Sequence, residues 1–124
     1  MILVDSCGWI DYLTDCPLAD KYEEYLQDSS QIIIPTIVLY EVYKKIRRER
    51  REEEAIIIAA QMKKTKIIPL TDEIALSSAE FSLRYKLPLA DSIVYATAIK
   101  ENVQVVTSDS HFEGLDRVIF MEGK

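Results

Sequence analysis

Four acidic residues of this sequence stand beside or within apolar segments, where a charge needs a partner. Asp5 directly follows the aliphatic run ILV, and Glu41 is the only charged residue between positions 37 and 43. Asp91 interrupts the stretch LPLADSIVYA, and Asp109 follows VQVVTS. Burying an ionised carboxylate is costly unless the charge is paired or bound to a cation. These four side chains are therefore the first candidates for chemistry.

The chemistry that these residues favour is the binding of a divalent metal ion. Four like charges that converge on one place repel one another strongly unless a cation lies between them. Oxygen ligands without histidine or cysteine favour Mg²⁺ or Mn²⁺ over zinc. Such an ion lowers the pKa of a bound water molecule and stabilises charge on a phosphate. We predict that Asp5, Glu41, Asp91 and Asp109 share such a metal site.

Each acid also has a simpler structural explanation. Asp5 and Asp109 could cap the helical turns that follow them, and Asp91 would favour the N-terminal end of a helix whatever else it does. Capping cannot explain Glu41, which falls in a second helical turn. Its alternative is an ion pair with Lys45, a spacing that stabilises a helix by only ~0.5 kcal/mol. A shared metal site explains all four positions together.

Short aliphatic runs without alternation predict the strands of a parallel sheet that is covered on both faces. We expect strands over residues 2–4, 32–34, 67–70, 103–106 and 117–121. Apolar residues at helical spacing predict helices that follow Ser6, span 18–28, follow Thr36 as N-cap, span 55–62, follow Thr71 and span 90–101. This alternation predicts a three-layer α/β/α fold with a mainly parallel sheet of about five strands. Asp5 and Asp109 then lie at the carboxyl edge of the sheet, where ligands bind.

Composition limits the class of protein and its partners. The 124 residues suit one domain, residues 1–124, and the net charge of -6 disfavours a surface that binds polyanions everywhere. The N-terminal sequence MILVDSCGW does not resemble a signal peptide, and the aliphatic run at 55–60 is too short to span a membrane. Cys7 and Cys16 match neither a disulfide framework nor a metal-binding spacing. We therefore expect a cytoplasmic protein that does not enter membranes.

A nucleic-acid substrate would need a local basic surface, and the segment after Glu41 offers one. Its cations are Lys44, Lys45, Arg47, Arg48, Arg50 and Arg51. Lys45 and Arg48 fall on nearly the same helical face as Glu41, so they could lead phosphates towards the metal site. The alternative is intrahelical ion pairing of Arg48 with Glu52 and of Arg50 with Glu54.

Three stretches of the sequence resemble the PIN domain, and in particular the VapC-type toxins of toxin–antitoxin pairs. They are VDSCGWIDYL at 4–13, PTIVLYEVYKKI at 35–46 and LPLADSIVYATAIKENVQVVTSDSHF at 87–112. The resemblance implies that Asp5, Glu41, Asp91 and Asp109 bind Mg²⁺ or Mn²⁺ and support the hydrolysis of RNA. It places Ser6 and Thr107 at positions that border the site. It further implies a homodimer that a cognate antitoxin protein holds inactive.

Other readings remain open at this point. The chain could be a nuclease-fold module that binds a protein partner with little or no catalysis, and Trp9, Tyr12, Tyr40 and Tyr43 could line a groove for an antitoxin helix. A DNA-directed nuclease of the same fold ranks lower, because the sequence has no long insertion for a DNA-binding arch. His111, the only histidine, precedes Phe112 in what resembles a packing motif, so we expect it to be structural.

Overall fold

The computed structural model describes residues 1–122, and a single five-stranded sheet runs through them. The strands are β1 (Ile2–Val4), β2 (Ile32–Pro35), β3 (Lys66–Ile68), β4 (Gln104–Thr107) and β5 (Val118–Phe120). They lie in the order β3-β2-β1-β4-β5, and every neighbouring pair is parallel. The predicted α/β fold with a parallel sheet of five short strands is confirmed.

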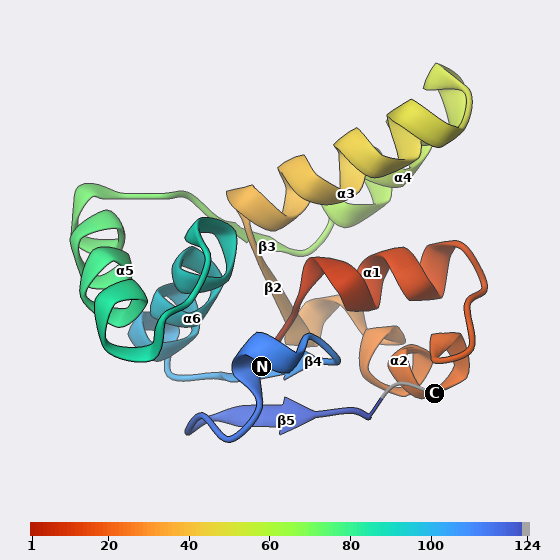
Figure 1. The fold of residues 1–124 in the computed structure, drawn as a ribbon. Coiled ribbons are helices and arrows are strands. Elements are labelled where there is room, and N and C mark those ends of the chain that lie inside the picture. The colour runs from red at the N-terminus through yellow and green to blue at the C-terminus, as the bar shows by residue number, and fades with distance from the viewer. Residues whose placement is uncertain (123–124) are drawn as a thin grey trace.

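Six α-helices connect these strands within the described part of the chain. They are α1 (Ser6–Leu13), α2 (Ala19–Leu26), α3 (Thr36–Glu49), α4 (Glu52–Met62), α5 (Asp72–Tyr85) and α6 (Leu89–Glu101). Figure 1 shows α5 and α6 on one side of the sheet and α1 and α2 on the other; α3 runs out from the end of β2, and α4 returns behind it towards β3. Among residues 1–122, no helix combines the length and the apolar character that crossing a bilayer requires.

The hydrophobic core lies where the central strands meet α3 and α6. The three isoleucines of β2 are at most 1% exposed, as are Val38, Val42 and Ile46 along one face of α3. In α6, every residue from Ser92 to Ala98 is buried. Burying one such aliphatic side chain contributes about 1.5–3 kcal/mol, so these elements are held firmly in place. The first turn of α6, which carries Asp91, is thereby fixed against the sheet.

Several element boundaries differ from those that the sequence predicts. Thr36 is the first residue of α3 instead of its N-cap, a position that Pro35 takes without a side-chain hydrogen bond. Strand β3 ends at Ile68 instead of residue 70, because Pro69 has no backbone N–H to donate to a neighbouring strand. Asn102 ends α6 as predicted, with a φ of 57° that asparagine tolerates well.

The basic segment is divided between two helices. Arg50 adopts an extended backbone (φ -137°, ψ -176°), which ends α3 before α4 begins at Glu52. The predicted pair between Arg48 and Glu52 is therefore wrong, since helical spacing does not continue across the break; Arg47 pairs with Glu52 instead, at 3.4 Å. The predicted pair between Arg50 and Glu54 is present at 3.5 Å.

Helix α1 packs closely on α2 at a glycine. A Cβ atom on Gly8 would lie 2.7 Å from Tyr22 Cδ1 and 2.7 Å from Val4 Cγ1, closer than carbon atoms can approach. Both Tyr22 and Val4 are fully buried, so neither can easily move aside. The absence of a side chain at position 8 is what allows this approach.

The order of the strands creates a crevice at one edge of the sheet. The chain moves from β1 to β2 and β3 on one side, and then returns to place β4 and β5 on the other side of β1. Where adjacent parallel strands lead away in opposite directions, the connecting segments separate at the carboxyl ends of the strands. In this protein that point lies beyond β1 and β4, which are followed by Asp5 and by the segment that contains Asp109.

Candidate metal centre

Asp5 is the most deeply buried acid of the site. It directly follows β1, is 3% exposed, and forms the N-cap of α1 by accepting a hydrogen bond from the backbone N–H of Ser6 at 2.8 Å. The hydroxyl of Thr107 donates to its other carboxylate oxygen at 3.0 Å. The capping explanation is thus correct, but it accounts for only one of the two oxygens. The second oxygen is held by a residue from β4, 102 positions away in the chain.

Thr107 ties two of the predicted ligands together. Its side chain is fully buried at the end of β4, and besides donating to Asp5 its hydroxyl accepts a hydrogen bond from the backbone N–H of Asp109 at 3.0 Å. One hydroxyl group therefore fixes the position of the Asp5 carboxylate and the direction of the chain at Asp109. The structure places Thr107 directly beside the predicted metal ligands.

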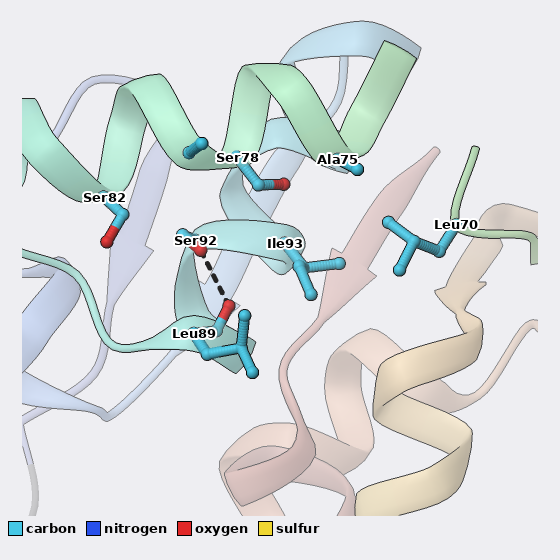
Figure 2. A pocket seen from close by; sticks show the side chains of 8 residues that line it. Leu70, Ala75, Ser78, Ser82, Leu89, Ser92 and Ile93 are labelled. Carbon is cyan, nitrogen blue, oxygen red and sulfur yellow. Dashed lines mark hydrogen bonds between the residues drawn. The ribbon is translucent and has the colours of Figure 1, made fainter. Parts of the chain in front are cut away.

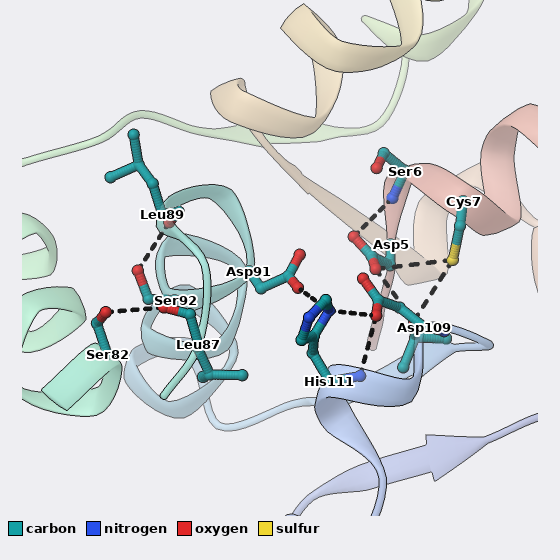
Figure 3. A network of polar contacts seen from close by, with 11 residues as sticks. Asp5, Ser6, Cys7, Ser82, Leu87, Leu89, Asp91, Ser92, Asp109 and His111 are labelled. Atoms are coloured by element: carbon teal, nitrogen blue, oxygen red, sulfur yellow. Dashed lines mark hydrogen bonds and ion pairs between the residues drawn. The ribbon is translucent and has the colours of Figure 1, made fainter. Parts of the chain in front are cut away.

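Asp91 and Asp109 approach each other from different elements. Asp91 lies in the first turn of α6, and Asp109 caps a short 3₁₀ helix, Ser110–Phe112, by accepting from the backbone N–H of His111 at 3.0 Å. Between the two carboxylates lies the imidazole of His111, with Nδ1 2.7 Å from Asp109 Oδ1 and 3.2 Å from Asp91 Oδ2. Figure 3 shows these three side chains beside Asp5 in one cluster.

Glu41 reaches the same region from the second turn of α3. It is half-buried, and Ser6 and Glu41 both line a hollow beside the start of α1. Burial raises the pKa of the Glu41 carboxyl, the Ser6 hydroxyl lowers it in part, and the charge of Asp109 raises it again. Its predicted alternative partner is not used, because Lys45 pairs with Glu49. The carboxylate of Glu41 therefore interacts electrostatically with the other acids of the site more than with any nearby cation.

The electrostatics of the cluster show that its carboxylates are poorly compensated. Burial raises the pKa of Asp5 from 3.8 to about 6, with further contributions from Glu41 and Asp109, despite the hydrogen bonds from Ser6 and Thr107. Burial and the charges of Asp5 and Asp109 raise the pKa of Asp91 to about 8. For Asp109, burial acts in the same direction, but hydrogen bonds from His111 outweigh it and lower the pKa. A cation in the cluster would relieve the repulsion between these groups.

The donor atoms fit a divalent metal ion. Ligand atoms of Asp91, Asp109 and His111 all lie within 4.8 Å of one another, and Asp5 and Glu41 add carboxylates at the edge of the same crevice. A set dominated by carboxylate oxygens suits Mg²⁺ or Mn²⁺. All four acids selected from the sequence are brought together, and each interacts electrostatically with at least one other.

The contacts of His111 with two acids of the site were not predicted from the sequence. Its side chain is 52% exposed and contacts two acids, whereas the neighbouring Phe112 is fully buried and carries the packing role that was expected of the motif. The spacing of Asp109 and His111, two positions apart after a strand, was the one available signal. Proximity to Asp91 could not be read from the sequence, because α6 and the 3₁₀ helix meet only in the folded chain.

A second polar network supports the cluster from behind. The Cys7 thiol lies 3.4 Å from Thr107 Oγ1 and 3.7 Å from Asp5 Oδ2, and burial raises the pKa of this thiol. The Tyr22 hydroxyl donates to Ser108 Oγ at 2.8 Å. A thiol that stays protonated is a poor nucleophile, so Cys7 acts as a packing and hydrogen-bonding residue.

A hollow lined by cations opens beside Glu41. It has a volume of about 250 Å³ and is lined by Ser6, Ile10, Tyr40, Glu41, Lys44, Lys45 and Arg48. The structure thus confirms that Lys45 and Arg48 share a face of α3 with Glu41. This arrangement gives the acid cluster a positively charged neighbour on one side.

A separate apolar pocket lies away from the acids, between α5 and α6. Figure 2 shows this pocket, of about 330 Å³, with Leu70, Leu89 and Ile93 among its lining residues. Its serine hydroxyls are already used: Ser92 donates to the carbonyl of Leu89 at 2.7 Å, and Ser78 and Ser82 also donate to backbone carbonyls. With its hydroxyls committed to the backbone, the pocket has no group placed for catalysis.

Comparison with known proteins agrees with the observed fold. The sequence profile of the PIN domain matches residues 2–118. The chain belongs to the PIN domain family. A search of curated protein sequences found no match.

Solved PIN domain structures have the same fold over nearly the whole chain. A toxin–antitoxin complex from Klebsiella pneumoniae superimposes with a TM-score of 0.81 at 25% identity, covering 96% of each chain. VapC20 of Mycobacterium tuberculosis, described as a sarcin–ricin loop cleaving toxin, gives 0.78 at 17% identity, covering 95% of this chain and 97% of its own. FitAcB from Neisseria gonorrhoeae gives 0.74 at 18% identity, covering 98% and 97%.

Proposed function

We propose that this PIN domain protein is a metal-dependent endoribonuclease, that it is the toxin of a toxin–antitoxin pair, and that residues 1–124 act as a single nuclease domain. The observation that carries the proposal is the convergence of a buried carboxylate, Asp5, with Asp91, Asp109 and Glu41 at the carboxyl edge of the sheet. The fold neighbours support it, since one is described as a toxin–antitoxin complex and another as a toxin that cleaves the sarcin–ricin loop.

The protein groups have distinct roles in this proposal. Asp5, Asp91 and Asp109 hold Mg²⁺ or Mn²⁺, and Glu41 holds a second ion or orients the attacking water. The bound ion supplies a water of lowered pKa and charge stabilisation at the scissile phosphate. Thr107 keeps the Asp5 carboxylate in one orientation through its 3.0 Å hydrogen bond, and the backbone N–H of Ser6 fixes the other oxygen. No side chain has to form a covalent bond with the substrate.

Cleavage of RNA with and without metal tests the proposed reaction. We expect the metal-stripped protein to leave a single-stranded RNA intact, Mg²⁺ or Mn²⁺ to start cleavage, and EDTA to stop it. A DNA oligonucleotide of the same sequence should be cleaved much more slowly. Equal cleavage with and without EDTA would contradict the metal-dependent reaction, and preferential cleavage of DNA would favour a DNA-directed nuclease. Binding of partners without any cleavage would favour a protein-binding module.

The cation-lined hollow beside Glu41 is the proposed path for the RNA backbone. Lys45 and Arg48 line it together with Lys44, and the ring of the exposed Tyr40 forms part of its wall. Lys45 and Arg48 both lie close to Glu49, but these are exposed pairs that contribute little to stability. Phosphates can therefore replace Glu49 as their partners at small cost.

Charge reversal in this hollow should weaken RNA binding. For Lys45→Glu with Arg48→Glu we expect affinity for single-stranded RNA to fall about tenfold or more at low salt. We also expect the slope of log affinity against log salt concentration to become shallower by about 0.7 for each phosphate contact that is lost. Fluorescence anisotropy with a labelled RNA at several salt concentrations measures both quantities. Lys21→Glu with Lys64→Glu makes the same change in net charge outside the hollow and should leave binding nearly unaffected. An unchanged salt slope in the double variant would exclude this path.

We also propose a cognate antitoxin protein and a homodimer as the partners of this chain. Support for the first comes from neighbours that are described as toxin–antitoxin complexes, and from an apolar hollow beside Tyr40 and Tyr43. Trp9 is buried, so it takes no part in such a groove. Exposed leucines on α5 and at the start of α6 support the second. Co-expression with the adjacent gene, followed by mass measurement of the purified species, would show neither a complex nor a dimer if the proposal is wrong.

A further inference from the structure

The imidazole of His111 lies beside the carboxylates of both Asp91 and Asp109. Its Nδ1 atom faces both carboxylates, at 2.7 Å from Asp109 Oδ1 and 3.2 Å from Asp91 Oδ2. The contact to Asp109 is local, but the contact to Asp91 joins the 3₁₀ helix to α6. His111 is the only histidine in the sequence, and it is the only non-carboxylate donor in this three-residue cluster.

We propose that His111 is a ligand of the metal ion through Nδ1, so that the ion has mixed oxygen and nitrogen coordination. This inference rests on the proposed metal-dependent function, and it assigns a residue that the four-acid set leaves out. The chemical consequence is a preference for Mn²⁺ or another transition metal over Mg²⁺, because imidazole nitrogen binds transition-metal ions well and magnesium poorly.

The separations between the donor atoms fit this coordination. In an octahedral site with bonds of about 2.1 Å, adjacent ligand atoms lie about 3.0 Å apart. The distances from Nδ1 to the two carboxylate oxygens, 2.7 and 3.2 Å, lie on either side of that value. All three donor atoms lie within 4.8 Å of one another, so the three can share one ion.

The competing explanation is that His111 is a placeholder. In that case the imidazole would only form hydrogen bonds with the carboxylates of Asp91 and Asp109 while the metal is absent, and would move away when the ion binds. Coordination requires the ring to stay near the ion, and the backbone N–H of His111 is itself bonded to Asp109 Oδ1 at 3.0 Å. The Asp109 side chain thereby keeps the histidine backbone, and with it the ring, close to the ion.

Electron spin echo spectroscopy of bound Mn²⁺ tests the assignment directly. Untagged protein grown with ¹⁵N-labelled histidine contains one labelled imidazole, that of His111. We expect the unlabelled protein with Mn²⁺ to show the modulation of a directly bound ¹⁴N, and labelling to replace it by the ¹⁵N pattern. His111→Ala should abolish the modulation and weaken Mn²⁺ binding about tenfold, while Mg²⁺ binding changes by less than about threefold.

The outcomes separate this inference from the proposed function. Ser110→Ala, in the same 3₁₀ helix, should leave both the modulation and the affinities unchanged. If Mn²⁺ binds without nitrogen modulation, or binds His111→Ala as tightly as the natural protein, His111 is not a ligand of the ion. Either result would leave the proposed carboxylate site unaffected. No binding of Mn²⁺ to the natural protein would overturn the metal site itself.

Discussion

In the proposed ribonuclease, Asp5→Asn should greatly reduce RNA cleavage and should also stabilise the metal-free protein. Asp5 is 3% exposed, and burial raises its pKa from 3.8 to about 6. When an acid with that pKa shift ionises, the folded protein loses about 3 kcal/mol of stability, since each tenfold change in proton affinity corresponds to about 1.4 kcal/mol. Asparagine removes the charge but cannot accept hydrogen bonds at both positions, so we expect a net gain of about 1–2 kcal/mol at pH 8. Cleavage should fall at least about 100-fold.

The same shifts set the pH dependence of the metal-free protein. Because the folded state binds the protons of Asp5 and Asp91 more tightly than the unfolded state does, stability is highest when both are protonated and falls as pH rises. The loss should extend from about pH 4 through the pKa values of about 6 and about 8. Urea unfolding in EDTA at pH 5 and pH 8 measures it. Asp5→Asn should reduce the difference, and so should Mn²⁺ added at pH 8.

An exposed acid provides the matched control for this prediction. Asp20→Asn changes a solvated carboxylate in the first turn of α2 and should alter neither cleavage nor the pH dependence of stability. If Asp5→Asn were less stable than the natural protein in EDTA at pH 8, the buried charge would not be a source of instability. If it still cleaved RNA at the natural rate, Asp5 would not be a metal ligand.

Gly8→Ala should destabilise the protein by about 1–3 kcal/mol, because the added methyl group has no space. Its Cβ would lie 2.7 Å from both Tyr22 Cδ1 and Val4 Cγ1, and the helix-forming advantage of alanine recovers only ~1 kcal/mol. Displacing Tyr22 would also disturb Ser108, which accepts its 2.8 Å hydrogen bond, and with it the segment that carries Asp109. We therefore expect weaker Mn²⁺ binding as well as a lower midpoint of urea unfolding.

Gly114 offers the contrast that isolates crowding from backbone conformation. It has a φ of +85°, and a Cβ there would meet no atom within 4 Å. Gly114→Ala should cost about 1 kcal/mol through its backbone alone and leave metal binding unchanged. A Gly8→Ala variant that is as stable as the natural protein would mean that α1 and α2 are not packed as closely as described.

The parts of the site that could be predicted from the sequence are those set by a single element. Asp5 follows a buried strand and Glu41 interrupts an apolar helix, so the cost of burying each charge is visible in the local sequence. The parallel sheet follows from aliphatic strands that alternate with helices, which also predicts that strand ends share an edge. For this reason the secondary structure and the four acids could be predicted from the sequence.

The remaining features depend on contacts between elements or on local breaks. The contact of His111 with Asp91 could not be predicted, because it depends on α6 placing Asp91 Oδ2 3.2 Å from Nδ1 of the ring. The position of the Cys7 thiol beside Asp5 and Thr107 depends on the pairing of β1 with β4. The ion pair of Arg47 with Glu52 was not predicted, because no feature of the sequence indicates that Arg50 is extended and divides α3 from α4.

The hydrogen bond between Asp5 and Thr107 has a consequence for the order of events during synthesis. The two residues are 102 positions apart, although their strands are neighbours in the sheet. Translation therefore produces Asp5 first, and the residue whose hydroxyl orients its carboxylate is added 102 positions later. Pairing between such distant strands is also the slow kind of contact in folding. In a nascent chain the Asp5 carboxylate thus lacks this hydrogen bond until β4 has paired with β1.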